Sequence, residues 1–210
     1  MVTARTPADA FDLLDWKRRV FGLYAEVRAG GDGRAGWDRW REVRHDLITS
    51  HPQSPIPEGD RERHPGPVYF EYDPQARVLA DVETAEPETV VIEGSAEGRF
   101  EATRFGRAGF ELAGAEQSLS LYWLEGYGGG VFVSFRDATS GRESYGACRY
   151  LLDTVKGADL GMEDGLLVLD FNFAYNPSCA YDPRWVCPLA PPDNRLALPI
   201  RAGERTPPKA

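Results

Sequence analysis

Charged and amide side chains are concentrated in two stretches in the second half of this 210-residue chain. The first spans residues 135–151 and reads FRDATSGRESYGACRYL, and the second spans residues 169–181 and reads LDFNFAYNPSCAY. Tyrosine, arginine, carboxylate and amide groups can orient a small organic ligand at the mouth of a barrel. The candidate ligand-binding residues are therefore Tyr145, Arg149, Asp170, Asn172 and Asn176.

The same stretches also have a purely structural interpretation. Aspartate, threonine and serine side chains bond nearby backbone amides in hairpin turns, where glycine supplies a positive φ. Buried cysteines pack as small hydrophobes, and buried asparagines satisfy backbone groups that lack ladder partners. The residues expected in these turn and wrap roles are Asp137, Thr139, Ser140, Gly141, Cys179, Cys187 and Asn194. Both interpretations stay open at the level of the sequence.

Sequence motifs of the common enzyme classes are absent, because the chain has no GxSxG, HExxH, phosphate-binding loop or GxGxxG pattern. His51 and His64 each precede a proline, which predicts solvated positions away from the polar stretches. The alternative to a binding module is a hydrolase that uses carboxylates such as Asp137 and Asp170, or the thiol of Cys179. A third hypothesis is a structural or interaction protein.

The cysteine pattern argues against a metal centre. Cys148, Cys179 and Cys187 form no CxxC pair and have no neighbouring histidine, so we expect no metal and no cofactor. The first seven residues lack the apolar segment of a secretory signal, and no run approaches the roughly 20 apolar residues of a membrane span. The sequence thus predicts a cytoplasmic protein whose Cys179 and Cys187 are reduced. Alkylation without reductant, followed by mass spectrometry, tests this state, and a loss of two protons from the pair would contradict it.

Charge excludes one class of partner. The chain has 24 basic and 33 acidic residues, a net charge of −9. Nucleic-acid binding needs a concentrated basic face, so we expect no nucleic-acid partner and no membrane partner. The expected partner is a small-molecule ligand, and the sequence does not indicate an oligomeric state.

Two helices are expected in residues 1–50. Thr6, Pro7 and Asp9 provide a cap residue, a proline at the first helical position and an acid in the first turn. Apolar residues then recur at steps of three and four, which predicts one helical stripe. The stripe of the first helix is Leu13, Trp16, Val20, Leu23 and Val27, and that of the second is Trp37, Trp40, Val43 and Leu47. The glycine-rich residues 30–33 separate the two helices.

The remaining chain alternates between short apolar segments and turns. The nine segments that read as strands are 68–72, 77–82, 89–93, 100–104, 109–112, 119–124, 131–135, 145–152 and 166–173. Strands in series without intervening helices predict a mainly β (α+β) fold: an antiparallel meander that closes into a small barrel or curled sheet. The two N-terminal helices pack outside it, and a long ordered C-terminal wrap follows. The expected divisions are a helical segment at 1–50, a proline-rich linker at 51–67, a β domain at 68–204 and a flexible tail at 205–210.

Strand register places two of the candidate residues together. If segments 145–152 and 166–173 pair antiparallel, with Asp153 opposite Leu166, then Arg149 faces Asp170 directly. A cross-strand arginine–aspartate pair would explain both residues.

A third motif, CPLAPPDNRL at residues 187–196, completes a pattern with the first two. Together the three motifs resemble a bacterial and archaeal family known as domain of unknown function 1684. The resemblance is strongest from about residue 130 to residue 204. It implies no activity.

Overall fold

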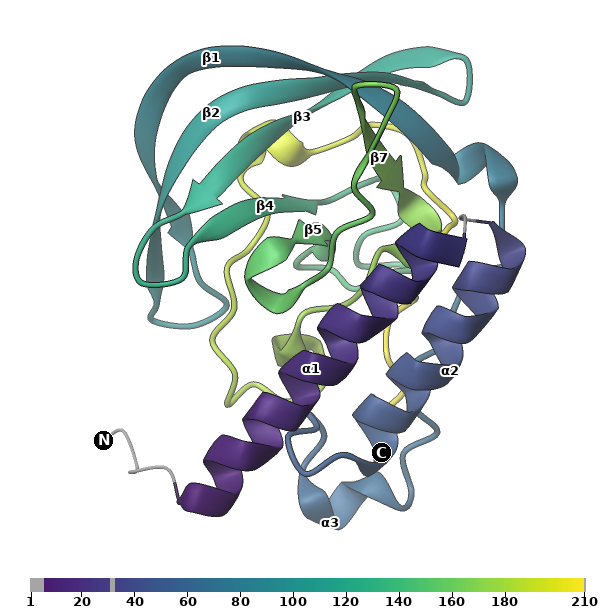
Figure 1. Ribbon diagram of the computed structural model, residues 1–210, viewed down its shortest axis with the longest axis vertical. Coiled ribbons are helices and arrows are strands. Elements are labelled where there is room, and N and C mark those ends of the chain that lie inside the picture. The colour runs from purple at the N-terminus through teal and green to yellow at the C-terminus, as the bar shows by residue number, and fades with distance from the viewer. Residues whose placement is uncertain (1–5, 31–32, 210) are drawn as a thin grey trace.

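The structure is a computed structural model that describes residues 6–30 and 33–209. Two long helices lie side by side along one flank of a curled sheet (Figure 1). The helices are α1 (Pro7–Gly30), α2 (Arg34–Ser50) and the short α3 (Glu58–Arg61). Residues 31 and 32, within the predicted break at 30–33, lie outside the described residues, and so do residues 1–5.

The start of α1 is capped as its sequence predicts. The hydroxyl of Thr6 accepts a hydrogen bond from the amide of Asp9 at 3.1 Å, and the Asp9 carboxylate accepts one from the amide of Thr6 at 3.0 Å. This reciprocal pair satisfies backbone donors that the first helical turn leaves unpaired. The two predicted helices are confirmed. Within the described residues, no helix is both long and apolar enough to cross a membrane.

Seven antiparallel strands form one sheet in the order β5-β4-β3-β2-β1-β7-β6. Their bounds are β1 Arg77–Glu93, β2 Arg99–Leu112, β3 Ala115–Leu124, β4 Gly130–Phe135, β5 Arg149–Asp153, β6 Met162–Glu163 and β7 Leu166–Asp170. The predicted mainly β meander is confirmed, and the sheet curls without closing. The barrel alternative is wrong because β5 and β6 do not pair with each other and both remain edge strands.

Fewer and longer strands replace several of the predicted short ones. Predicted segments 77–82 and 89–93 are one strand, β1, and segments 100–104 and 109–112 are one strand, β2. Turn-forming residues interrupt the alternation of apolar and polar residues in β1, but the strand continues through them. The pairing of β1 with β2 shifts its register between Thr84 and Glu88 and then resumes. Such bulges bend a strand and tolerate proline, which the sequence alone does not reveal.

The C-terminal segment packs against residues 68–72. Residues 68–72 form no regular strand and instead lie along this segment, with Tyr69 bridging to Glu204. Gly203 has φ +75°, and a Cβ there would lie 2.5 Å from the carbonyl oxygen of Ala174. Only glycine lets the chain approach this closely. Glu204, the last residue of the expected β domain, is fully buried.

The predicted pairing of Arg149 with Asp170 is also wrong. Strand β7 pairs with β1, which places Arg77 opposite Asp170, and β5 pairs with β4, which places Phe135 opposite Arg149. The reason lies in the short β6, which forms a hairpin with β7 and occupies its second edge. With β1 on one side and β6 paired to Leu166 and Leu167 on the other, β5 cannot pair along β7 in the predicted register.

The proline-rich segment 51–67 is packed against the body of the protein. His51 and His64, expected in solvent, are 6% and 8% exposed. The His51 ring packs edge-on against Trp16 at 5.3 Å between centroids, and its Nδ1 accepts a hydrogen bond from the amide of Gln53 at 3.0 Å. Local side-chain-to-backbone bonds of this kind replace the ladder bonds that prolines cannot make.

Two apolar clusters form the core. One lies inside the curl of the sheet and includes Phe110, Phe135 and Phe171. The other joins the helices to the sheet and includes Trp37 and Trp40, each 1% exposed. This second cluster is what positions the helices over the C-terminal motifs.

Candidate functional site

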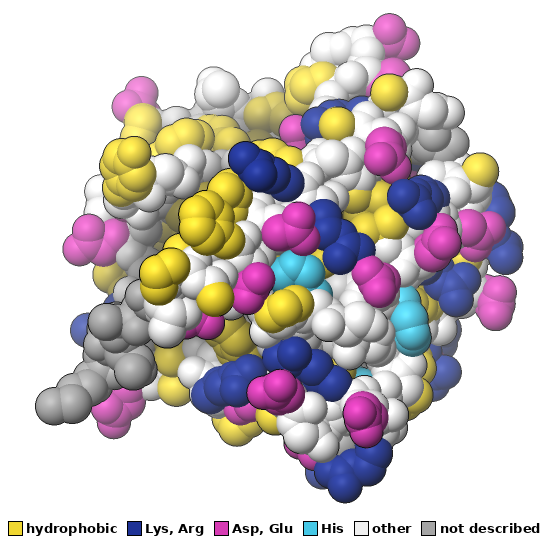
Figure 2. All heavy atoms as spheres, turned by 60° about the horizontal axis from the view of Figure 1, so that its bottom comes forward, with side chains coloured by type: hydrophobic (Ala, Val, Ile, Leu, Met, Phe, Trp, Pro, Cys, Tyr) yellow, Lys and Arg dark blue, Asp and Glu magenta, His cyan; other side chains and the backbone are white. Residues whose placement is uncertain are grey.

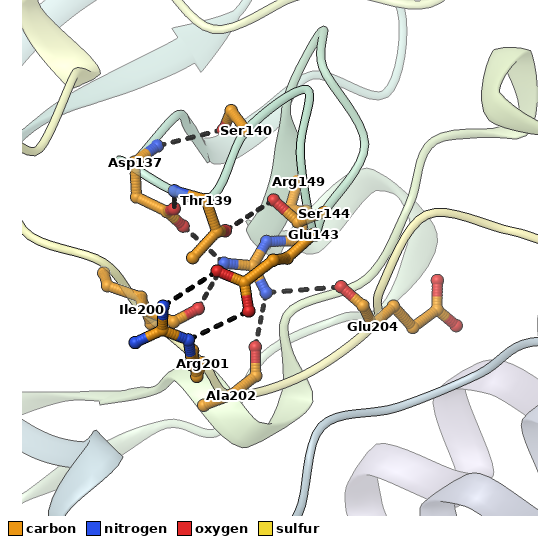
Figure 3. A network of polar contacts seen from close by, with 10 residues as sticks. All are labelled: Asp137, Thr139, Ser140, Glu143, Ser144, Arg149, Ile200, Arg201, Ala202 and Glu204. Atoms are coloured by element: carbon orange, nitrogen blue, oxygen red, sulfur yellow. Dashed lines mark hydrogen bonds and ion pairs between the residues drawn. The ribbon is translucent and has the colours of Figure 1, made fainter.

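Arg149 is the centre of a buried polar network rather than part of a pocket. It is 1% exposed, and its Nη2 donates to the Asp137 carboxylate at 2.5 Å and to the carbonyl of Ile200 at 3.0 Å. Its Nη1 donates to the carbonyls of Ala202 and Glu204 (Figure 3). The guanidinium therefore joins the start of β5 to the C-terminal segment. Burial lowers the pKa of Arg149, and the charge of Asp137 acts in the opposite direction.

The partner of Arg149 comes from a tight turn in the first motif. The Asp137 carboxylate also accepts from the amide of Thr139 at 2.5 Å, and the Asp137 amide donates to the hydroxyl of Ser140 at 3.1 Å. The hydroxyls of Thr139 and Ser144 lie 2.7 Å apart, and Gly141 has φ +80°. The turn thus holds the Asp137 carboxylate against the guanidinium (Figure 3).

Asp170 and Asn172 form a second buried unit. Asp170 accepts hydrogen bonds from the backbone amide of Asn172 at 2.9 Å and from its Nδ2 at 2.8 Å. Asn172 in turn donates to the carbonyl of Asp73 at 2.7 Å, and its own carbonyl accepts from the indole of Trp37 at 3.0 Å. The unit links α2 to the segment that precedes β1. Asn194 plays a similar part elsewhere, because its amide group donates to the carbonyls of both Ser120 and Ser134.

The titration of Asp170 gives a first testable prediction. Burial raises the pKa of Asp170, and the hydrogen bonds from Asn172 offset part of that rise. A raised folded-state pKa stabilises the protein in acid, and this contribution disappears as pH rises through the folded value. The unfolding free energy of the wild type minus that of Asp170→Asn is therefore expected to fall as pH rises from about 3.9, the pKa of a free aspartate. Urea titrations at stepwise pH measure this difference. A difference that increases over that range would contradict the assignment.

A cavity of about 180 Å³ lies between the two long helices and the second motif. The half-buried side of the α1 stripe forms one wall, and α2 and the C-terminal segment form the others. The apolar and aromatic lining residues include Leu13, Trp16, Val20, Leu23, Trp40, Leu47, Ile48, Pro55 and Trp185. The polar lining residues include Lys17, Tyr24, Arg44, Gln53, Lys156, Tyr175, Asn176, Ser178 and Tyr181. Two larger and more open depressions lie between the sheet and residues 193–197 and beside the glycine-rich loop at 126–130.

A buried ion pair fixes one wall of this cavity. Arg44 is bonded through both Nε and Nη2 to the carboxylate of Glu204, and that carboxylate also accepts from the amide of Asn176 at 2.7 Å. Burial disfavours the charged guanidinium, but the charge and hydrogen bonds of Glu204 outweigh burial and raise the pKa of Arg44. Arg44 also lies over the Tyr175 ring, 4.6 Å from its centroid.

Tyrosine hydroxyls surround the ion pair. Tyr24 accepts from the Trp40 indole at 3.1 Å, and Tyr175 donates to the Asp153 carboxylate at 3.2 Å. Burial raises the pKa of Tyr24, Tyr175 and Tyr181, so these hydroxyls stay protonated at neutral pH. They act there as neutral polar groups.

Charge in the cavity differs from charge on the surrounding surface. Its lining contains three basic residues, Lys17, Arg44 and Lys156, and no aspartate or glutamate. Figure 2 shows acidic and basic side chains interspersed on the face that carries the lower ends of the helices. Arg44 is neutralised by Glu204, and Lys156 lies 3.3 Å from the Asp153 carboxylate. Lys17 is exposed and forms no ion pair with the described residues. The mouth is therefore positive in a chain whose net charge is −9.

Tyr145 and the three cysteines lie outside the cavity lining. The Tyr145 hydroxyl donates to the Sγ of Cys179 at 3.8 Å. Cys187 is anchored to Ser95, since its amide donates to the Ser95 hydroxyl at 3.1 Å. All three cysteines are free and buried. Among the described residues, no group of histidine, cysteine and acidic side chains is arranged to hold a metal ion.

Comparison with known protein families assigns the chain to one of them. The family described as "Protein of unknown function (DUF1684)" matches residues 63–205. The chain belongs to this family. The match covers all three motifs and begins in the segment that follows the N-terminal helices, so α1 and α2 lie outside it.

A solved structure of another protein is similar to this chain over most of its length. It is the solution NMR structure of the uncharacterised protein from gene locus rrnAC0354 of Haloarcula marismortui, which is 36% identical to this chain. The similarity has a TM-score of 0.59 and covers 82% of this chain and 93% of that one. A search of the curated proteins finds no match to this chain.

Of the five candidate ligand-binding residues, the cavity lining contains Asn176. Arg149, Asp170 and Asn172 are each at most 1% exposed and take part in the buried networks described above. Tyr145 contacts Cys179. The sequence reasoning missed Tyr175, Tyr181 and the helical wall. The two tyrosines stand within the second motif, and the apolar stripe of α1 extends beyond the part that the core buries, which is a signal for an additional partner surface.

Proposed function

We propose that the protein is a small-molecule-binding module whose site is the cavity between α1, α2 and the C-terminal segment. The observation that carries the proposal is the space of about 180 Å³ with mostly apolar walls and a lining that contains basic but no acidic residues. An apolar cavity of about 150 Å³ accommodates benzene. The expected ligand is thus a small organic acid with a body the size of an aromatic ring.

The walls suggest an orientation for this ligand. Trp16 and Trp40 would pack against the apolar body, and the carboxylate would lie at the mouth near Lys17 and Lys156. The proposal moves the site away from Arg149 and Asp170 and retains Asn176. It also retains the cytoplasmic location expected from the sequence, where small organic acids occur as metabolites.

The hydrolase alternative lacks a comparable arrangement. Asp137 is bonded to Arg149, and Asp170 is bonded to Asn172, so the two carboxylates serve different networks. Neither residue belongs to the cavity lining. General acid–base catalysis requires such groups within hydrogen-bonding reach of a substrate.

Paired ligands test the binding proposal directly. Benzoate, phenylacetate and indole-3-acetate are expected to raise the thermal midpoint and to change tryptophan fluorescence, because Trp16, Trp40 and Trp185 line the cavity. The matched amides, which lack the charge, are expected to bind more weakly. Equal shifts from acids and amides would contradict the role of the basic mouth, and no shift from any of them would contradict the ligand class.

Two substitutions test separately how the charge at the cavity mouth and the volume of the cavity contribute to ligand binding. Lys17→Glu is expected to weaken carboxylate binding by about tenfold, or about 1.4 kcal/mol, and to spare the amides. Each charge contact is worth about 1 kcal/mol at 4 Å in water, and the substitution replaces attraction by repulsion. Arg18→Glu is the matched control, because Arg18 is an exposed neighbour on α1 outside the cavity lining. Val20→Trp fills the cavity and is expected to abolish binding of acids and amides alike. Fluorescence titration measures all three variants, and equal losses in Lys17→Glu and Arg18→Glu would place the ligand elsewhere.

A further inference from the structure

Three polar groups of the cavity lining have hydrogen-bonding capacity that no described residue uses. The hydroxyl of Tyr181 and the Oδ1 of Asn176 are buried, and neither has a hydrogen-bond partner among the described residues. The Tyr24 hydroxyl accepts from the Trp40 indole at 3.1 Å, but no described residue accepts its proton. All three residues line the cavity. Buried polar groups are nearly always paired, so unpaired groups at a cavity wall indicate a place for a polar group of the ligand.

The orientation of the Asn176 side chain is fixed by its other end. Its Nδ2 donates to the carbonyl of Arg205 at 2.7 Å. Turning the amide over would set its oxygen against that carbonyl oxygen, and two acceptors cannot bond each other. The backbone amide of Asn176 donates to the Glu204 carboxylate at 2.7 Å, and the residue is 3% exposed. The Oδ1 of Asn176 is therefore a fixed, buried acceptor.

The two tyrosine hydroxyls are donors close to the same ion pair. Burial raises the pKa of Tyr24 and of Tyr181, and the nearby Arg44 guanidinium offsets part of the rise. The charge of Glu204 raises both pKa values further. The Asn176 side chain also acts on Tyr181, so the two lie near each other, although the Tyr181 hydroxyl lacks the distance and direction of a hydrogen bond to any described residue.

A single hydroxyl group on a ligand has the hydrogen-bonding capacity to match all three groups. It carries one proton, which suits the Oδ1 of Asn176, and two lone pairs, which suit the protons of Tyr24 and Tyr181. A carboxylate has no proton to give to Asn176. An ammonium group has no lone pair with which to accept from the tyrosines. Of these three common polar groups, the hydroxyl is thus the one that leaves no buried group unpaired.

Exposure separates this polar wall from the basic mouth of the cavity. Lys17 is exposed, and the side chain of Lys156 is 51% exposed, so these two lysines mark the side that faces solvent. The three unpaired groups belong to buried parts of the lining. A ligand whose carboxylate lies beside the lysines therefore directs the far end of its ring toward the unpaired groups.

We propose that the interior of the cavity recognises a hydroxyl group, so that the ligand is an aromatic acid with a hydroxyl on the ring opposite the acid. Tyr24, Asn176 and Tyr181 are the residues that determine this specificity. The inference rests on the binding function proposed above and adds the chemistry of the second end of the ligand.

A series of three acids tests the inference in the unmodified protein. The acids are para-hydroxyphenylacetate, para-methylphenylacetate and phenylacetate, because a methyl group has nearly the size of a hydroxyl and forms no hydrogen bond. Calorimetric titration is expected to show that the hydroxy acid binds about tenfold more tightly than the methyl acid. Equal affinity of the three acids would overturn this inference and leave the proposed function intact, and it is the result expected if the three groups only hold a water molecule. Failure of all three acids to bind would overturn both.

A tyrosine substitution tests the residue assignment. Tyr181→Phe removes the hydroxyl and keeps the ring, and it is expected to lower the affinity ratio of hydroxy acid to methyl acid by at least about threefold, the effect of one neutral hydrogen bond. Tyr145→Phe is the matched control, because Tyr145 lies outside the cavity lining. It is expected to keep the wild-type ratio. A ratio that Tyr181→Phe leaves unchanged, or that both variants lower equally, would overturn the assignment. The ratio cancels a general loss of stability, and the wild-type series decides the question even if a variant folds poorly.

Discussion

Arg149→Met is expected to lower the free energy of unfolding by about 3–5 kcal/mol, the cost of removing one partner from a buried ion pair. The substitution leaves the Asp137 carboxylate buried without its counter-charge. It also removes the donor for the main-chain carbonyls of Ile200, Ala202 and Glu204. Methionine retains much of the side-chain volume, so the loss reports on charge and hydrogen bonding more than on packing. Urea denaturation followed by circular dichroism measures the difference.

An exposed arginine of the same network provides the matched control. Arg201 forms two 2.9 Å hydrogen bonds to Glu143, but its side chain is 60% exposed (Figure 3). Arg201→Met is expected to cost at most about 1 kcal/mol, because water screens exposed pairs. Adding Asp137→Leu to Arg149→Met should recover part of the loss, since both buried charges are then removed. Equal effects of the Arg149 and Arg201 substitutions would contradict the central place of Arg149.

The sequence predicts the elements of this fold better than it predicts their partners. The cap at Thr6 and the two helices depend on local patterns, and the structure has both. The pairing of Arg149 with Asp170 fails because strand order is a long-range property. The two-residue strand β6 carries almost no sequence signal, yet it pairs with Leu166 and Leu167, where the predicted pairing with β5 would begin.

The candidate site was likewise predicted only where local sequence patterns were sufficient. Asn176 was identified as an amide side chain of the second polar motif, and it lines the cavity. The opposite wall consists of Leu13, Trp16 and Val20, whose types are those of an ordinary helical core stripe. Periodicity shows which face of a helix is apolar, but the packing partner of that face is set by the tertiary fold. Local sequence patterns therefore could not predict the cavity.

Glu204→Ala is expected to cost about 3–5 kcal/mol of unfolding free energy, although the sequence places Glu204 beside a tail. The carboxylate is fully buried and pairs with Arg44, 160 positions earlier in the chain. It also accepts from the amide of Asn176 at 2.7 Å. Removing it leaves the Arg44 guanidinium buried without its counter-charge and detaches α2 from the C-terminal segment. Since Arg44 and Asn176 both line the cavity, ligand binding should weaken in parallel with stability.

A truncation provides the control for this prediction. Ending the chain after Pro208 removes the exposed Lys209 and the residue that follows it. The truncation leaves the Arg44–Glu204 pair intact. This shortened protein is expected to match the wild type within about 0.5 kcal/mol, as surface changes do. Chemical denaturation of Glu204→Ala and of the truncated chain side by side measures the contrast. If Glu204→Ala were as mild as the truncation, the C-terminal segment would be the loose tail that its composition suggests, and Arg44 would have to be charge-compensated by another residue.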